Sequence, residues 1–148
     1  MKRILYILAA VLLTAISCQK EGNALWENLV GEWHYTAEES GVAEDVYISF
    51  AENGFFEIYQ KIGEGPYWHV TGEFALDRET SVLSGFYSDR YPWSYSYVIE
   101  VSSTTLVMKA VELEGHIQNY VREQIPAEVR DKSLPLTKAE DLADPRHL

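Results

Sequence analysis

Hydrophobic and polar residues alternate along most of the chain between residues 29 and 122. Short runs of β-branched and aromatic residues recur there at intervals of roughly ten residues, and turn-forming residues separate them. This pattern predicts eight strands, over residues 31–37, 46–50, 55–62, 67–76, 82–87, 93–101, 106–111 and 116–122. No long helical pattern interrupts the strands, so the sequence indicates an all-β fold.

The segments between the strands are short and carry turn residues. Asn53-Gly54 supplies the positive φ angles of a tight hairpin, and residues 63–66, Gly-Glu-Gly-Pro, are a strong turn signal. Consecutive hairpins predict an antiparallel up-and-down meander. Eight strands in that order can close into a barrel, which removes exposed sheet edges and leaves an interior that is either filled or holds one small ligand. Periodicity alone leaves a two-sheet sandwich open as the alternative.

The first residues of the chain follow a different pattern. Lys2 and Arg3 precede a predominantly apolar run over residues 4–16, and small residues follow. This run of 13 residues is shorter than the about 20 that a helix needs to cross a bilayer. The pattern therefore predicts that residues 1–17 are a secretory signal peptide rather than a membrane-spanning or buried helix.

Cys18 follows this segment directly and is the only cysteine of the chain. An exported protein with one cysteine has no intramolecular disulfide partner for it. Residues 13–18, Leu-Thr-Ala-Ile-Ser-Cys, resemble the bacterial lipobox, although Ala15 stands where leucine is commonest. The resemblance implies lipidation of Cys18, and two or more acyl chains such as palmitate hold a protein stably at a membrane. Cleavage by the general signal peptidase, which would leave a free thiol, is the alternative.

The residues after Cys18 are polar. Residues 18–24 are expected to form a lipidated tether, and the start Gln19-Lys20-Glu21 resembles the surface-export tag of lipoproteins in the Bacteroidetes. We therefore expect an outer-membrane lipoprotein, on the cell surface or on the periplasmic face. The barrel domain is expected over residues 25–123.

Several motifs inside this barrel segment follow one another in a set order. They are Leu29-Val30-Gly31-Glu32-Trp33, the Asn53-Gly54 hairpin, Gly65-Pro66-Tyr67, Leu106-Val107-Met108 and a late Arg122. Together they resemble the lipocalin-like domains of exported Bacteroidetes lipoproteins over residues 24–122. The resemblance implies that Gly31 and Trp33 open the first strand, that Trp33 closes one end of the barrel, and that Arg122 packs on it by a cation–π contact. It also implies a pocket for a small apolar ligand, here without disulfides to staple it.

Residues 124–148 contain three prolines, many charged residues and few aromatic ones. This composition predicts a mobile, polar C-terminal tail. Thr137 and Glu140 have the spacing of a capping box, which predicts one helical turn near residues 137–142. Covering one mouth of the barrel is an alternative role for the tail.

The balance of charges excludes some partners. The net charge is −11, and loss of Lys2 and Arg3 with the signal peptide makes it −13. An acidic surface repels nucleic acid and anionic membrane surfaces, so we expect neither as a partner. The sequence carries no signal for an oligomeric state.

Residue patterns typical of enzymes and metal sites are missing from the sequence. No nucleophile-elbow, Walker or dinucleotide motif is present, and metal-ligand spacing is lacking among His34, His69, His116 and His147. The carboxylate pairs Glu38-Glu39 and Glu44-Asp45 are expected in a solvated polar loop rather than across a cleft. We therefore expect no catalytic residues, no cofactor, no metal and no enzymatic activity.

Aromatic residues are the richest candidates for binding. Core packing accounts for most of them, and the candidates for ligand contact are Tyr67, Trp68, Tyr91, Trp93, Tyr95 and Tyr97. Inward-facing aromatics would line a cavity, which predicts a binding module for a small apolar ligand. Exposure of Tyr91 and Trp93 in their loop would instead suit a cell-surface interaction or glycan-capture accessory protein.

Overall fold

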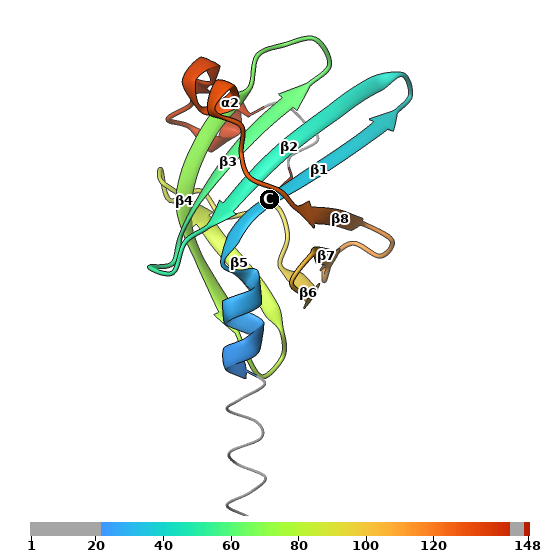
Figure 1. Cartoon of the computed structure of the whole chain (residues 1–148), viewed down its shortest axis with the longest axis vertical. Coiled ribbons are helices and arrows are strands. Elements are labelled where there is room, and N and C mark those ends of the chain that lie inside the picture. The colour runs from blue at the N-terminus through green and yellow to red at the C-terminus, as the bar shows by residue number, and fades with distance from the viewer. Residues whose placement is uncertain (1–21, 143–146) are drawn as a thin grey trace, which may run out of the picture.

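The computed structural model describes residues 22–142 together with His147 and Leu148. Eight antiparallel strands form a closed barrel, because each strand pairs with the next along the chain and the last pairs with the first (Figure 1). The strands are β1 (Gly31–Glu39), β2 (Val42–Phe50), β3 (Phe55–Ile62), β4 (Trp68–Asp77), β5 (Val82–Tyr87), β6 (Tyr97–Val101), β7 (Thr105–Ala110) and β8 (Ile117–Arg122). The predicted eight-stranded up-and-down barrel is confirmed, and its closure excludes an open two-sheet sandwich.

Two strands begin four residues away from the start that the alternation predicts, and the other six begin within one residue of it. β2 begins at Val42 and pairs with β1 along its whole length. β6 begins at Tyr97 rather than residue 93, because Trp93 turns into the barrel and stands edge-on to Phe56, with ring centroids 5.2 Å apart. Gly85 makes room for this ring, since a Cβ atom there would lie 2.6 Å from Trp93 Cε2.

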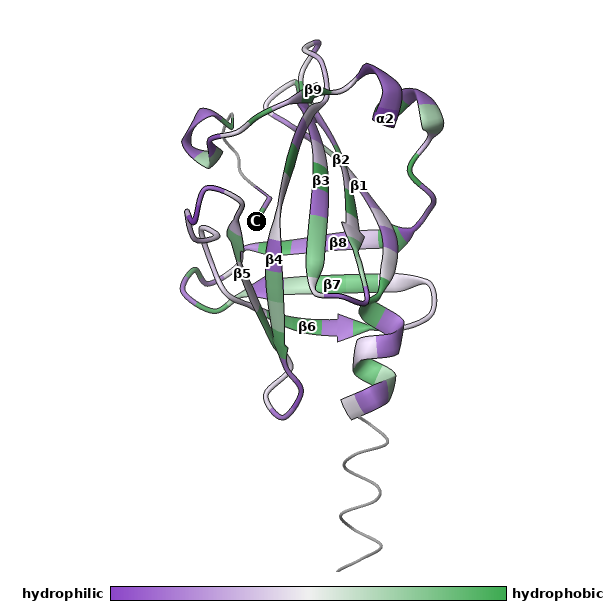
Figure 2. Ribbon diagram, turned by 90° about the vertical axis from the view of Figure 1, so that its left-hand side faces the viewer, coloured by the Kyte–Doolittle hydropathy of each residue, from purple (hydrophilic) through white to green (hydrophobic). Residues whose placement is uncertain are grey.

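Two of the strand pairings are short. β5 and β6 pair only at Val82↔Val98 and Leu83↔Tyr97, and β1 and β8 pair only at Trp33↔Arg122 and His34↔Val121. Figure 2 shows the result: β6, β7 and β8 run across the direction of β1 to β4. The barrel is therefore built of two blocks, β1–β5 and β6–β8, that meet at a β5–β6 seam and a β1–β8 seam.

One end of the barrel is closed by Trp33 and Arg122. Trp33 is fully buried and donates its indole N–H to the Leu29 carbonyl oxygen at 2.9 Å. The Arg122 guanidinium lies 4.1 Å above the Trp33 ring, the contact that the family resemblance implies, and donates to three backbone carbonyl oxygens, those of Asn28, Val30 and Ser103. Gly31, at φ 138°, leaves room for the guanidinium, because a Cβ atom would lie 2.1 Å from Arg122 Nη1.

A helix over residues 22–29 precedes β1 at the closed end. It buries Leu29 completely and packs Leu25 and Trp26 against the core. The predicted signal peptide and Cys18 lie outside the described residues, and residues 22–24 of the predicted tether belong to this helix. In the part of the chain that the structure describes, no helix is long and apolar enough to span a membrane.

The predicted tail carries three short elements that lie on the barrel. They are α2 (Ala127–Lys132), β9 (Leu134–Pro135), which pairs in parallel with β4, and the 3-10 helix η1 (Ala139–Asp141). The helical turn predicted near residues 137–142 is therefore confirmed. The capping box is wrong, because the turn begins after Lys138 and no side chain caps it.

Candidate functional site

Residues outside the eight strands fill part of the barrel interior. Ala139, Leu142 and Leu148 are buried and belong to the same hydrophobic core as the strand side chains. The chain end marked C lies within the outline of the barrel in both views (Figures 1 and 2). His147 and Leu148 lie in this interior and are 2% and 0% exposed. We name these two residues the guest dipeptide.

Two tyrosine hydroxyls of the barrel wall hold the backbone of the guest dipeptide. The Tyr87 hydroxyl, at the end of β5, donates to the Leu148 carbonyl oxygen at 2.8 Å. The Tyr97 hydroxyl, at the start of β6, donates over a longer 3.4 Å to the His147 carbonyl oxygen. Burial raises the pKa of Tyr97, so its hydroxyl keeps the proton that it donates. The wall thus recognises two successive carbonyl groups rather than one side chain.

The His147 side chain faces Glu44 of β2 and Tyr35 of β1. His147 Nε2 lies 3.0 Å from Glu44 Oε2, and the Tyr35 and His147 ring centroids are 4.9 Å apart. Within the described residues neither ring nitrogen of His147 has an aligned hydrogen bond. Burial, with a smaller effect of His116, lowers the pKa of His147 to about 4, while burial and Glu39 raise the pKa of Glu44. Both shifts favour the neutral forms of His147 and Glu44.

A second group of buried polar residues lies on β8 and just before it. The Tyr120 hydroxyl donates to Gln118 Oε1 at 2.9 Å, and Gln118 Nε2 lies 3.2 Å from His116 Nε2. Burial raises the pKa of Tyr120, which keeps this hydroxyl protonated. Tyr35 connects the two groups, with its ring centroid 5.4 Å from that of Tyr120. The wall around the guest dipeptide is therefore a polar lining set into an otherwise apolar core.

Glu44 corrects one prediction from the sequence. It was expected beside Asp45 in a solvated loop, but it lies in β2 and is 6% exposed. Glu44 shares its strand parity with Val46, Ile48 and Phe50, which all face the core. That parity was the signal that the sequence offered, and extending the strand by four residues would have found it.

The six aromatic candidates are distributed over several places. Trp93 and Tyr97 lie in the core, with ring centroids 6.4 Å apart, and Tyr95 packs edge-on against Tyr97. Trp68 is half-buried against the same core. Tyr67 lies on the outer side, where its hydroxyl donates to Asp45 Oδ2 at 2.5 Å. Tyr91 is 44% exposed in its loop. Tyr97 is the candidate that reaches the guest dipeptide, and sequence reasoning missed the other contacts, Tyr35, Tyr87 and Glu44.

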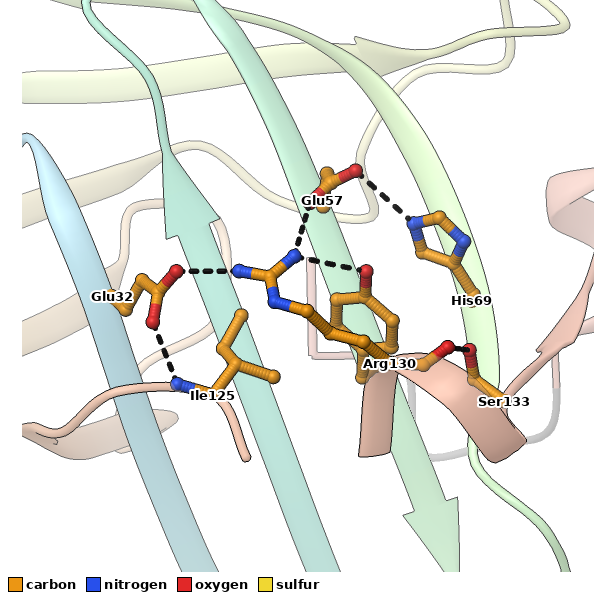
Figure 3. Close-up of polar contacts among 7 residues, drawn as sticks. Glu32, Glu57, His69, Ile125, Arg130 and Ser133 are labelled. Atoms are coloured by element: carbon orange, nitrogen blue, oxygen red, sulfur yellow. Dashed lines mark hydrogen bonds and ion pairs between the residues drawn. The ribbon is translucent and has the colours of Figure 1, made fainter. Parts of the chain in front are cut away.

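A polar cluster on the outer face joins α2 to the barrel (Figure 3). Arg130 pairs with Glu32 of β1 and lies 3.1 Å from Glu57 of β3 and 3.3 Å from the Tyr59 hydroxyl. Glu57 in turn lies 3.5 Å from His69 of β4. The two carboxylates and the guanidinium are 29–39% exposed, so each pair contributes about 0–1 kcal/mol.

Apolar residues beneath this cluster account for its position. Ile125 and Val129 pack on Tyr47 and Tyr59, and all four are buried. Arg130 therefore covers a small hydrophobic contact, and we assign the cluster a structural role.

The two histidines on the outer face both stack on tyrosine rings. His34 lies 2.7 Å from both Asp45 and Glu123 and stacks on Tyr47. His69 stacks on Tyr59 with ring centroids 4.4 Å apart. Among residues 22–142, 147 and 148 no group of three or more histidine, cysteine or acidic side chains is arranged to hold a metal.

Exposed aromatic residues surround two shallow pockets on the outside of β4 and β5. Phe55 and Phe86, 50% and 55% exposed, stand in one cross-strand row with Glu73 between them. The first pocket, of about 160 Å³, includes these three residues and Arg90. The second, of about 180 Å³, lies between Phe86 and Tyr95. Tyr91 is exposed in the loop next to Arg90.

The chain was compared with known families and proteins. No protein-family model matches it, and no curated protein matches it. The interior combines two hydroxyl donors and one carboxyl group with an apolar surround. Such a combination can bind a small molecule.

Proposed function

We propose that the protein is an exported, membrane-anchored lipoprotein whose barrel is a non-enzymatic binding module for a small ligand with an apolar body. The guest dipeptide carries this proposal, because the strands enclose a space that a segment from outside them enters. Tyr87 and Tyr97 supply hydroxyl donors for carbonyl or carboxyl oxygens in that space. A mostly apolar site with a few convergent polar groups is typical of small-molecule binding.

Titration with a fluorescent apolar acid tests this function. The soluble chain beginning after Cys18 is expected to bind one dansylundecanoic acid saturably, with a dissociation constant on the order of micromolar and a blue shift of the dansyl emission. Unlabelled fatty acid should displace the probe. Absence of saturable binding, in this chain and in variants whose guest dipeptide is expelled, would contradict the proposal.

Outer-surface variants are the matched control for this titration. Phe86→Ala and Tyr91→Ala remove exposed rings and leave the interior lining unchanged. If the probe enters the barrel, both variants bind it with the affinity of the unaltered chain. Loss of binding in these variants would place the probe on the surface instead.

A cell-surface interaction or glycan-capture function is the second candidate, and the exposed row of Phe55, Glu73 and Phe86 favours it. Aromatic faces beside an acidic and a basic side chain suit the apolar and polar faces of a sugar ring. The burial of Trp93 weakens the version based on the 91–93 loop, because only one of its two aromatic rings, Tyr91, is exposed. Binding to immobilised polysaccharide that Phe86→Ala abolishes would support this candidate.

Replacement of Cys18 tests the membrane anchor. Cys18→Ala is expected to move the protein from the membrane fraction to the soluble fraction, because acyl chains on this residue would supply the anchoring free energy. Incorporation of radiolabelled palmitate should be lost in parallel. A Cys18→Ala protein that stays fully membrane-bound would refute lipidation as the anchor.

A further inference from the structure

We propose that the interior site binds an extended peptide segment, and that the guest dipeptide His147–Leu148 is its resident occupant, which an incoming peptide of the same kind must displace. This inference rests on the proposed binding function and adds the ligand class and its competitor.

The contacts of the two wall hydroxyls suit a peptide backbone. Tyr87 and Tyr97 donate to the carbonyl oxygens of two successive residues, at 2.8 and 3.4 Å. A fatty-acid carboxylate also has two acceptor oxygens, so the side-chain subsites next to the hydroxyls distinguish a peptide from a fatty acid. The hydroxyl positions accommodate two carbonyl groups in sequence.

The side chains of the dipeptide define two neighbouring subsites. Leu148 is fully buried in the hydrophobic core, so its subsite takes a branched apolar side chain. His147 Nε2 lies 3.0 Å from Glu44 Oε2 without an aligned hydrogen bond. The preceding subsite therefore suits a side chain whose N–H group can align on that carboxyl oxygen. The expected ligand is thus an extended segment with a histidine or similar donor followed by a leucine-like residue.

The resident occupant is imperfectly satisfied, which makes it displaceable. Neither ring nitrogen of His147 has an aligned hydrogen bond within the described residues, and the Tyr97 contact is long for an O–H···O bond. Unmet hydrogen bonds in a buried place lower the free energy that docking of the dipeptide contributes. A competing peptide that forms these hydrogen bonds binds more favourably than the dipeptide does. Its apparent affinity is lower than its intrinsic affinity, because the dipeptide occupies the site in part of the molecules.

The test measures binding of a peptide to the whole chain and to a variant whose occupant is expelled. Leu148→Asp places a carboxylate where a fully buried leucine lies, and it is expected to free the site. We expect the affinity for N-acetyl-His-Leu-amide, measured by calorimetry, to rise at least about tenfold over the unaltered chain. Leu113→Asp, the same change at a leucine that is 44% exposed, should leave the affinity unchanged.

Two comparisons decide between outcomes. N-acetyl-Leu-His-amide has the same composition in reverse order and should bind at least about tenfold more weakly, because it places each side chain in the wrong subsite. His147→Ala is the second opened variant, and it keeps the test valid if circular dichroism shows that Leu148→Asp does not fold. Equal affinities of both peptides, or no gain in either opened variant, overturn the inference. Binding of dansylundecanoic acid without peptide binding leaves the proposed function intact and refutes the peptide ligand, whereas failure of both probes refutes the binding function itself.

Discussion

Replacing Trp33 by alanine is expected to lower the free energy of unfolding by about 3–5 kcal/mol, the usual loss when a buried aromatic ring is truncated. Trp33 is fully buried, so the change leaves a cavity at the closed end of the barrel. It also removes the indole N–H that donates to Leu29 and the ring beneath the Arg122 guanidinium. Urea denaturation followed by circular dichroism measures the loss.

The chain offers a matched control in its second tryptophan–arginine pair. Trp26 is half-buried on the helix over residues 22–29, and Arg78 lies 5.3 Å from its ring centroid. Trp26→Ala should cost about 1–2 kcal/mol, since less area is uncovered. Combining Trp33→Ala with Arg122→Ala should give a coupling of about 0.5–2 kcal/mol. Equal losses at Trp26 and Trp33, or additive effects of the double variant, would contradict the role assigned to the closed end.

Lowering the pH from 7 to 4 is expected to weaken the docking of His147 by up to about 3 kcal/mol. Burial lowers the pKa of His147 from 6.5 to about 4, so the docked form binds a proton less readily than the free form. The docked form is therefore favoured fully above pH 6.5 and loses this advantage as the pH falls towards 4. Hydrogen exchange of the dipeptide and urea denaturation at several pH values follow the change.

Other titrating groups around His147 set the controls for this experiment. The pKa of Glu44 is raised, which favours the docked form as the pH falls and so opposes the His147 effect. His116 adds repulsion once both imidazoles are charged. Glu44→Gln removes the opposing group, so it should steepen the loss, and His147→Asn should flatten it. Parallel pH profiles for the unaltered chain and His147→Asn would show that His147 does not control docking.

The strands were predictable because one strong physical signal repeats along them. A strand with one face in the core must alternate, and every predicted strand coincides with an observed one. The start of β6 is an exception. Residues 93, 95 and 97 alternate in the same way, yet Trp93 packs against Gly85 and β6 begins only at Tyr97. The alternation of aromatic residues could not distinguish a strand from a ring that turns inward over a glycine.

The interior site was less predictable because it is assembled from distant segments. Glu44, Tyr87 and Leu148 come from β2, β5 and the end of the sequence, and no local spacing links them. The polar composition of residues 124–148 predicted a mobile tail. Composition gives no sign that four apolar residues of this segment are buried, namely Val129, Ala139, Leu142 and Leu148. A few well-placed apolar residues decide where such a segment docks, and composition averages them away.

The β5–β6 seam gives the guest dipeptide a mechanical role. Only two residue pairs join these strands, and Tyr87 and Tyr97 stand on opposite sides of that junction. An occupant that accepts hydrogen bonds from both hydroxyls therefore links β5 to β6 where their pairing is short. Without an occupant, β5 and β6 would separate more easily at this seam. The rigidity of the barrel would therefore depend on whether the site is occupied.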